Sequence, residues 1–358
     1  MTCKRKVNHP GLVIKDAIDE LNLNQSEFAL RSGLSIKNVS TLISGDSNIT
    51  FDVAVKLSYF FGNSVELWIN LQTQFDLFMT EFQRAYDYEN DWKVLKLIDK
   101  SFIEDYLGIQ IDTKHKVNTI NEIRKTFNVG YLTALKQPDI YAFYKTSVNK
   151  DIDENTIILR NAWISLAENK AREMTCKEFS KEKLLSSIPF IRSLTKLDQT
   201  VAFPKLKETL ANCGIKLVFL PYLKGSNVSG VTKWIANENC ILIAINDCGK
   251  YADKIWFAIF HELGHAIKNH KRHLTISYEK NKILDQEEID ANAFASESLI
   301  NERHYKDFVE RRDFSLKSIS SFAKSEEIAD FIVIGRLQND KLIPWSQYND
   351  CKIKYSNI

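Results

Sequence analysis

The sequence between positions 257 and 267 is Phe257-Ala258-Ile259-Phe260-His261-Glu262-Leu263-Gly264-His265-Ala266-Ile267, which places a His-Glu-x-x-His motif inside an apolar run of helical length. On a helix, residues four apart share a face, so His261 and His265 can direct two imidazoles at one metal ion. Glu262 then lies beside the metal, where its carboxylate can take a proton from a metal-bound water. Zinc suits this chemistry because it accepts nitrogen ligands and lowers the pKa of bound water to about 7.

The alternative for this segment is a buried structural helix whose histidines are satisfied in a core. The surrounding residues favour the metal site, because an apolar wall would hold the helix rigid and exclude water. This wall comprises Trp256, Phe257, Ile259, Phe260 and Leu263.

A catalytic zinc ion needs three protein ligands and a water molecule, so two histidines leave the predicted site one ligand short. The segment Glu287-Glu288-Ile289-Asp290-Ala291-Asn292-Ala293-Phe294-Ala295 offers a carboxylate on a following helix. Glu288 and Asn292 are four apart and share a face with Ala295, whose small side chain allows another helix to approach. We therefore predict Glu288 as the third ligand and Asn292 as the residue that orients a ligating histidine. Glu287 and Asp290 are the rival ligands, and a solvated acidic helix face is the alternative without a metal.

Residues 1–80 are predicted to form five short helices, because capping residues and glycines bracket each apolar segment. Asn24 is followed by Glu27 three residues later, which resembles a capping box. The expected helices are Leu12–Leu21, a second that opens at Asn24 and stops at Gly33, a third over Ile36–Ser44 between Ser35 and Gly45, a fourth over Phe51–Phe61 between Thr50 and Gly62, and a fifth that follows Ser64, carries Trp68 and continues past Leu71.

Two of these helices, joined by a tight turn at Gly33-Leu34, match the helix-turn-helix pattern of DNA-binding domains. The helix after the turn would then lie in the major groove and present one face to the bases. Its core-facing residues are predicted to be Val39, Leu42 and Ile43. The residues predicted to contact DNA are Ile36, Lys37, Ser40 and Thr41 in the groove, Gln25 at a base edge, and Asn38 at a phosphate.

The charge of this N-terminal segment argues against tight DNA binding by one copy. Residues 1–75 hold seven Lys or Arg and seven Asp or Glu, so the segment is neutral. Phosphate neutralisation supplies much of the affinity for DNA, and an isolated neutral module binds weakly. A helical dimerisation or protein-docking domain is the alternative to a groove-reading domain.

Residues 81–200 show charged and apolar residues at helical spacing and no motif that carries chemistry. We expect a helical middle region that positions the two ends of the chain and can hold a dimer interface. Trp163, Phe127 and Phe143 are predicted to be core residues, Pro138 to mark a break and Pro189 to disturb a helix. The expected helices are Val117–Thr126, Ile158–Met174 and Lys181–Leu194.

Residues 201–358 are predicted to contain a small β-sheet ahead of the His261 helix, which makes the whole chain mainly α with a small sheet (α+β). An exposed edge strand of such a sheet can hold an extended peptide across the metal. The expected strands are Ile215–Leu220, Val228–Ala236 and Cys240–Ile245, after a helix over Pro204–Asn212 and before a helix pair within Phe314–Asp330. Arg336, further on, is predicted to form a structural salt bridge.

The N-terminal segment resembles the HigA-type antitoxin branch of the XRE family of DNA-binding domains. The resemblance rests on Asn8-His9-Pro10-Gly11, on Leu23-Asn24-Gln25-Ser26-Glu27-Phe28-Ala29, and on Phe61-Gly62-Asn63-Ser64-Val65-Glu66-Leu67-Trp68-Ile69-Asn70-Leu71-Gln72. It implies a five-helix, lambda-repressor-like domain and a homodimer on a palindromic double-stranded operator, often that of its own operon.

The C-terminal segment resembles the ImmA/IrrE family of zinc metallopeptidases, in particular the branch fused to a HigA-type domain. The resemblance rests on Asp253-Lys254-Ile255-Trp256-Phe257-Ala258-Ile259-Phe260-His261-Glu262-Leu263-Gly264-His265, on Glu288, Ala291, Asn292, Phe294 and Ala295, and on Ile334-Gly335-Arg336-Leu337-Gln338. It implies a gluzincin-like site with His261, His265 and Glu288 on zinc and Glu262 as general base. It also implies a protein substrate, typically a repressor.

Composition sets limits on the class of protein. A hydrophobic content of 44%, a charged content of 26% and a net charge of +2 are ordinary for a globular protein and imply no general attraction to nucleic acid or membrane. The six cysteines are scattered without a Cys-x-x-Cys pair, no signal peptide opens the sequence, and no apolar run approaches the ~20 residues that span a bilayer. We therefore expect a cytoplasmic protein with no membrane partner.

The sequence thus predicts a cytoplasmic DNA-binding regulator (residues 1–80) joined through a helical middle (residues 81–200) to a zinc-dependent endopeptidase (residues 201–358) that cleaves a regulatory protein. The first alternative is a HigA-like antitoxin and autorepressor, bound to a cognate toxin, whose metallopeptidase-like domain senses or docks without proteolysis. The second is a peptidase whose N-terminal domain only docks its substrate.

Overall fold

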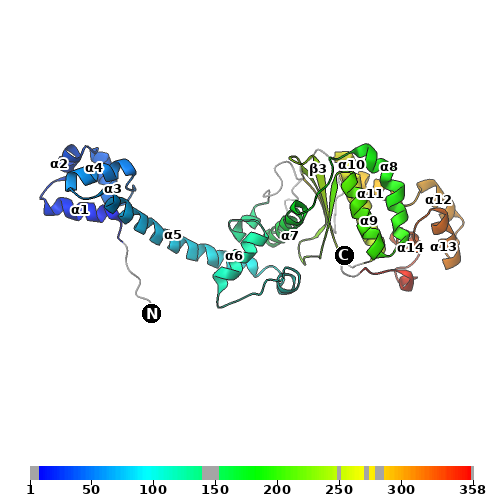
Figure 1. Cartoon of the computed structure of the whole chain (residues 1–358). Helices are drawn as coiled ribbons and strands as arrows, with labels where there is room; N and C mark the ends of the chain where they lie inside the picture. Colours follow the sequence, from blue (N-terminus) through cyan, green and yellow to red (C-terminus); the bar gives the residue numbers. More distant parts are fainter. Residues whose placement is uncertain (1–7, 139–152, 248–250, 270–273, 279–285, 356–358) are drawn as a thin grey trace. The chain divides into compact units, whose positions relative to one another are not determined.

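A computed structural model of the chain describes residues 8–138, 153–247, 251–269, 274–278 and 286–355. The chain divides into two compact units, Met1–Glu89 and Asn90–Ile358, which we call the N-terminal and C-terminal units. Helices predominate in both, and one four-stranded sheet lies in the C-terminal unit (Figure 1). The predicted α+β class is confirmed.

The N-terminal unit contains the five predicted helices of a helix-turn-helix domain. They are α1 (Pro10–Glu20), α2 (Gln25–Ser32), α3 (Ile36–Ser44), α4 (Phe51–Phe61) and α5 (Val65–Leu95). The fifth helix is much longer than the sequence indicated, because its cap and Trp68 show only where it begins. Its 31 residues extend beyond the end of the N-terminal unit at Glu89.

The predicted caps begin and end these helices. The side chains of Asn24, Ser35 and Thr50 accept hydrogen bonds from backbone N–H groups three residues ahead, at 2.9, 3.1 and 3.4 Å. Such caps satisfy donors that have no partner inside the helix. Gly33 and Gly45 end α2 and α3 with φ of 73° and 83°, a left-handed conformation that glycine adopts without strain.

The start of α1 explains the His9-Pro10-Gly11 sequence. His9 Nδ1 accepts a hydrogen bond from Gly11 N at 3.0 Å, and Pro10 occupies the first turn, where no N–H is needed. A Cβ on Gly11 would lie 1.7 Å from the carbonyl oxygen of Leu42. Glycine is therefore required where α1 crosses the end of α3.

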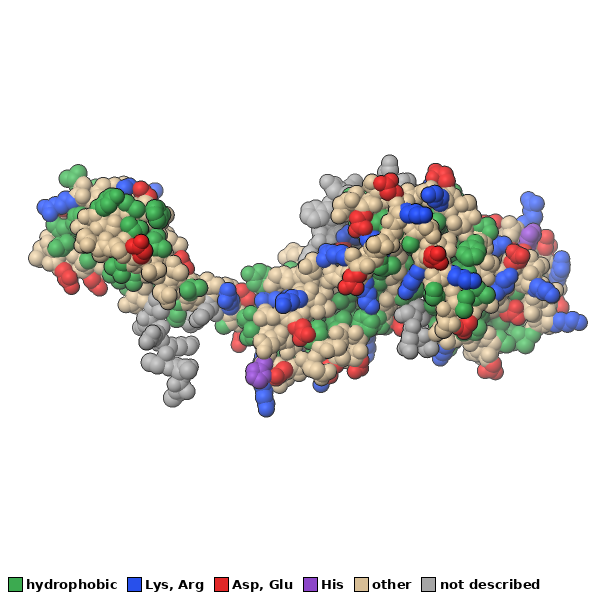
Figure 2. All heavy atoms as spheres, viewed as in Figure 1, with side chains coloured by type: hydrophobic (Ala, Val, Ile, Leu, Met, Phe, Trp, Pro, Cys, Tyr) green, Lys and Arg blue, Asp and Glu red, His purple; other side chains and the backbone are tan. Residues whose placement is uncertain are grey.

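The core of the N-terminal unit forms between these helices. Its fully buried members include Ile14, Phe28, Val39, Leu57 and Trp68. Val39 and Leu42 are buried and Ile43 is half-buried, as predicted for the inner face of α3. On the visible surface, acidic and basic side chains accompany one another, in keeping with the near-zero net charge (Figure 2).

The C-terminal unit begins with helices that were largely expected. They are a π-helical turn η1 (Phe102–Tyr106), α6 (Lys116–Thr126), a 3-10 turn η2 (Leu132–Lys136), α7 (Glu154–Arg172), α8 (Lys181–Ser193), a 3-10 turn η3 (Leu194–Lys196) and α9 (Gln199–Asn212). Phe127 and Trp163 are fully buried, and Phe143 lies outside the described residues.

One prediction in this part was wrong because proline was read as a helix start: α9 contains Pro204 within it. The reason is the N-cap: Asp198 Oδ1 accepts a hydrogen bond from Thr200 N at 2.9 Å and begins α9 five residues earlier than expected. Helix α8 runs through Pro189 over nearly the predicted bounds.

Four strands form the sheet in the order β1-β3-β2-β4. They are β1 (Ile215–Leu220), β2 (Val228–Ile235), β3 (Cys240–Asn246) and β4 (Leu274–Tyr278). Strand β1 is parallel to β3, and β2 is antiparallel to both β3 and β4. Every residue of β1 and β3 is buried, because helices cover both faces. Residues 215, 217 and 219 pack with α9 and α10, and residues 218 and 220 with α7. Strand β4 was not expected.

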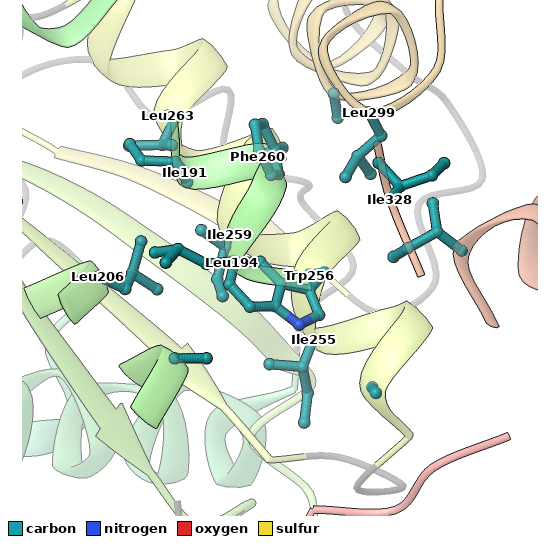
Figure 3. Close-up of a cluster of buried hydrophobic side chains, with 14 of the residues drawn as sticks. Ile191, Leu194, Leu206, Ile255, Trp256, Ile259, Phe260, Leu263, Leu299 and Ile328 are labelled. Atoms are coloured by element: carbon teal, nitrogen blue, oxygen red, sulfur yellow. The ribbon is translucent and has the colours of Figure 1, made fainter. Parts of the chain in front are cut away.

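The remaining helices are α10 (Ala252–Asn269), α11 (Gln286–Leu299), α12 (Glu302–Glu310), α13 (Leu316–Ser325), α14 (Asp330–Asn339) and the 3-10 turn η4 (Asn349–Cys351). Helix α12 was not expected. Trp256, Ile259, Phe260 and Leu263 of α10 pack into a buried apolar cluster with residues of α8, α9 and α11 (Figure 3). The predicted apolar wall around the motif is therefore part of the core.

The C-terminal segment contacts and stabilises the start of α10. Ala252 N donates to Ile353 O at 2.9 Å, and the buried pair Asp253–Lys352 has an O–N distance of 2.7 Å. Trp256 Nε1 donates to the Tyr355 hydroxyl at 2.8 Å inside the core. Among the described residues, no helix is both long enough and apolar enough to cross a membrane.

Replacing Tyr355 by Phe is expected to destabilise the C-terminal unit by about 1–3 kcal/mol, because the buried indole N–H of Trp256 loses its acceptor. The measurement is the free energy of unfolding in urea. Tyr131→Phe, at a ring that is 52% exposed, is the control and is expected to change little. Equal stability of both variants and the wild type would contradict the assignment.

Candidate metal centre and nucleic-acid interface

Helices α10 and α11 bring His261, His265 and Glu288 together. One ligand atom from each lies within 4.8 Å of the other two, and all three residues are buried. The two Nε2 atoms are 3.1 Å apart, and Glu288 places Oε1 3.3 Å from His265 Nε2 and Oε2 3.5 Å from His261 Nε2. Two imidazole nitrogens and one carboxylate oxygen therefore converge on one point.

Small residues allow the two helices to approach closely enough for this convergence. A Cβ on Gly264 would lie 3.1 Å from Ala291 Cα and 3.2 Å from a ring carbon of Phe294. A side chain at 264 would therefore make a tight contact that α11 must yield to by a few tenths of an ångström, and Ala295 is also fully buried. The glycine inside the His-Glu-x-x-His motif thus helps α11 to approach the histidines.

The electrostatics of this cluster suit a cation. Burial would raise the pKa of Glu288, but hydrogen bonds and charge from His261 and His265 lower it to about 2. Burial would lower the pKa of His261, yet the carboxylates of Glu288 and Glu262 raise it above its ordinary value. Glu288 is therefore ionised at neutral pH. A set of two nitrogens and one carboxylate oxygen matches the ligands that zinc takes in catalytic sites.

The two histidines differ in how their second nitrogen is held. Asn292 Oδ1 lies 3.0 Å from His261 Nδ1, which leaves His261 Nε2 facing the cluster. His265 Nδ1 is buried and has no hydrogen-bond partner among the described residues. Asn292 thus makes the contact that was expected of a residue orienting a ligating histidine.

The rivals of Glu288 lie elsewhere on α11. Asp290 accepts a hydrogen bond from Gln286 Nε2 at 2.8 Å, and neither Glu287 nor Asp290 belongs to the three-residue cluster. Arg336 pairs with Asp340 at 2.8 Å, so it forms the predicted salt bridge, although it also lines the cleft beside the cluster.

Two residues at the centre have no signal in the sequence. Thr232 Oγ1 donates to the buried carboxylate of Glu262 at 2.7 Å, and Ser277 Oγ lies 3.2 Å from His261 Nε2. Thr232 lies on β2 and Ser277 on β4. Strand pairing brings them to α10, and no spacing rule along the chain indicates such a contact.

A cleft of about 740 Å³ opens beside the cluster. Its lining comes from strands β2 and β4, from α10, α11 and α14, and from the segment after α14. Polar residues surround the cluster, and apolar side chains follow further along the same helices, among them Phe257, Ala258, Leu299, Ile300 and Ile332. The centre is therefore open to a ligand on one side and closed by the core on the other.

The predicted DNA contacts lie on the outer face of α2 and α3. Gln25, Lys37, Asn38 and Ser40 are exposed, and Ile36 is 58% exposed. An apolar side chain that exposed suits contact with a thymine methyl group in the major groove.

Thr41 differs from these residues. It is half-buried, and its hydroxyl lies 3.1 Å from the carbonyl oxygens of Lys37 and Asn38 and accepts from Ser47 Oγ at 3.0 Å. Its methyl group, rather than its hydroxyl, is what it can offer to a base.

Two family models match the chain. The helix-turn-helix model matches residues 14–68, and the model of a peptidase family described as the IrrE N-terminal-like domain matches residues 212–330. The first range contains the exposed face of α3, and the second contains His261, Glu262, His265 and Glu288.

Related proteins match at the N-terminal end. The helix-turn-helix transcriptional regulator YddM of Escherichia coli is 36% identical over 75 residues, which are 20% of this chain and 80% of that protein. Virulence-associated protein A' of Dichelobacter nodosus is 40% identical over 70 residues, 19% of this chain and 61% of that protein.

Solved structures match over a similar share. A protein from Nostoc punctiforme named as an antidote protein of a plasmid maintenance system is 36% identical, with 24% of this chain and 93% of that chain covered and a TM-score of 0.23. An addiction module antidote protein of the HigA family from Coxiella burnetii is 27% identical, with 24% and 94% covered and the same TM-score of 0.23.

Replacing Asn292 by Ala is expected to weaken binding of a divalent metal ion about ten- to hundredfold, because His261 loses the acceptor that fixes its ring. The affinity can be measured by competition with a chromophoric chelator. Asn292→Asp keeps an acceptor oxygen and should retain most of the affinity, while Asn339→Ala, also in the cleft, should not change it. Unchanged affinity in Asn292→Ala would contradict the orienting role.

Proposed function

This chain belongs to the XRE-type helix-turn-helix transcriptional regulators and carries an IrrE N-terminal-like peptidase domain, and we propose that it couples DNA binding to zinc-dependent cleavage of a regulatory protein. We take residues 1–80 as the DNA-binding domain, 81–200 as a helical middle region and 201–358 as the peptidase domain. The site of action would be the cytoplasm, where the DNA lies.

One observation carries the peptidase half of the proposal. His261, His265 and Glu288 present three ligand atoms within 4.8 Å, and Glu262 follows directly after the first of them. The cleft runs past these residues and is large enough for several residues of a peptide. A purely structural helix would not need a carboxylate held between two buried imidazoles, since burying these groups costs free energy.

The residues fit the hydrolysis of a peptide bond. His261, His265 and Glu288 would hold zinc, which when bound polarises a scissile carbonyl and activates a water molecule. Glu262 would accept the proton of the attacking water and pass it to the leaving amine. Asn292 would keep the ring of His261 in place, and the core behind α10 would keep bulk water out.

The DNA-binding half rests on the exposed face of α3, and the neutral charge of the N-terminal segment bears on how many copies bind. A neutral module gains little from phosphate contacts, so one copy alone would bind weakly. Two copies on two half-sites would bind far more tightly, because the second contact becomes intramolecular. We therefore propose a homodimer on a palindromic operator.

We propose a regulatory protein, in particular a repressor, as the substrate, and the proteins encoded beside this gene are the ones to test first. The second candidate function is an antitoxin that represses its own operon and binds a cognate toxin without cutting it. The two functions differ in one respect: only the first requires Glu262 as a base.

Purified wild-type protein is expected to contain about one zinc ion per chain by elemental analysis, because three ligands and a water complete a catalytic site. Glu288→Ala should lose the metal on dialysis. Glu287→Ala, the neighbouring carboxylate, is the matched control and should keep it. No zinc in the wild type, even after reconstitution, would refute the proposed peptidase.

The zinc-loaded protein is also expected to cleave one of the proteins encoded beside its gene, as judged by mass spectrometry. Glu262→Gln should keep its zinc and lose this cleavage, and a chelator should abolish it in the wild type. Zinc binding with tight capture of a neighbouring small protein, and no cleavage by the wild type, would favour the antitoxin.

Lys37→Ala is expected to weaken binding to the DNA upstream of its own gene. The loss should be larger for that DNA than for unrelated DNA, because Lys37 faces the bases in the major groove. Fluorescence anisotropy with both DNAs at one salt concentration measures the two affinities. Lys56→Ala is the matched control, because Lys56 pairs with Asp52 at 2.8 Å on α4. Equal effects of the two substitutions would argue against α3 as the reading helix.

A further inference from the structure

The carboxylate of Glu262 lies in a slot on strand β2. Its side chain is 1% exposed, and Oε2 accepts a hydrogen bond from Thr232 Oγ1 at 2.7 Å. A Cβ on Gly230 would lie 2.3 Å from Oε1 and 2.8 Å from the carboxyl carbon. Any side chain at 230 would therefore displace the carboxylate from its present place.

The slot is formed by two residues on the same face of strand β2. Gly230 and Thr232 are two apart on β2, so both face α10, while Val231 between them packs on the other side of the sheet with α7. The pairing of β2 with β4 shifts register between Val228 and Gly230. Such bulges re-aim the side chains next to functional sites. Here the shift lies beside Ser277, which contacts His261.

The hydrogen bond from Thr232 selects one position of the carboxylate. A threonine hydroxyl carries one proton, and the carboxylate at 2.7 Å is nearer than the backbone carbonyl of Glu262 at 3.2 Å. A hydroxyl bond to an ionised carboxylate is about twice as strong as a neutral one. Without it, the carboxylate of Glu262 loses its hydrogen bond to the sheet.

We infer that Thr232, with the space left by Gly230, is a positioning residue that fixes Glu262 beside the metal centre, with Oε2 tied to the sheet. This inference rests on the proposed function and adds to it a residue on a different element. Thr232 acts only through Glu262 and touches neither the predicted ligands nor a substrate.

Acetohydroxamic acid provides a test that needs no substrate. It chelates zinc through its two oxygens, and a carboxylate held beside the metal accepts a hydrogen bond from the bound hydroxamate. Its affinity for the full-length, zinc-loaded protein, measured by calorimetry, therefore reports whether Glu262 is in place. Zinc content and thermal unfolding are measured on each sample.

Thr232→Val is expected to weaken hydroxamate binding about tenfold, with about one zinc per chain retained, because the side chain keeps its size and loses the hydroxyl. Thr232→Ser, which restores the hydroxyl, should bind within about twofold of the wild type. Glu262→Gln should bind at least as weakly as Thr232→Val. Gly230→Ala should also weaken binding and serves if Thr232→Val does not fold.

Thr195→Val is the matched control, because Thr195 is a buried threonine whose hydroxyl donates to Arg192 O at 2.8 Å away from the cleft. It should lose some stability and keep the hydroxamate affinity. This control separates a general effect of a buried Thr→Val change from an effect on Glu262.

Wild-type affinity in Thr232→Val, with Glu262→Gln weakened, would overturn the positioning role. Wild-type affinity in Glu262→Gln would overturn it as well, since the carboxylate would then not reach the metal's ligand. Loss of zinc in Thr232→Val would show that Thr232 shapes the whole centre instead. Absence of zinc from the wild type would refute both proposals, whereas the expected affinities without any cleavage would refute only the peptidase.

Discussion

The contact of the Glu288 carboxylate with the imidazoles of His261 and His265 is the interaction on which the rest of the C-terminal unit depends. Three buried polar groups are costly to bring together unless each satisfies the others. Glu288 does so for both histidines, with carboxylate oxygens 3.3 Å from His265 Nε2 and 3.5 Å from His261 Nε2. This arrangement requires α10 and α11 to approach closely, and Gly264 provides the space.

The sheet packs against α10 and thereby supports this arrangement. Strands β1 and β3 are buried on both faces, so α10 rests on a rigid layer that α7 covers from the other side. Strand β2 then contributes chemistry of its own, because Gly230 and Thr232 receive the side chain of Glu262. The ligands come from helices, and strands contact both them and the base, since Ser277 of β4 lies against His261 and Thr232 of β2 holds Glu262.

The N-terminal unit combines a well-defined fold with an unusual surface. Capped helices and a close contact at Gly11 fix the orientation of α3, while the segment around it carries no excess positive charge. Such a module gains little from attraction to phosphate, so base contacts would have to carry its recognition of DNA.

Local interactions were determined by the sequence itself. The caps at Asn24, Ser35 and Thr50, the five N-terminal helices, three of four strands and the shared face of His261 and His265 depend on residues within a few positions of one another. Tertiary structure alone decided that Thr232 and Ser277 lie at the centre, and it places Glu288, which helical phase favours over Glu287 and Asp290, against the histidines. Those contacts join elements 16 to 30 residues apart, where strand pairing and helix approach, rather than chain periodicity, set the distances.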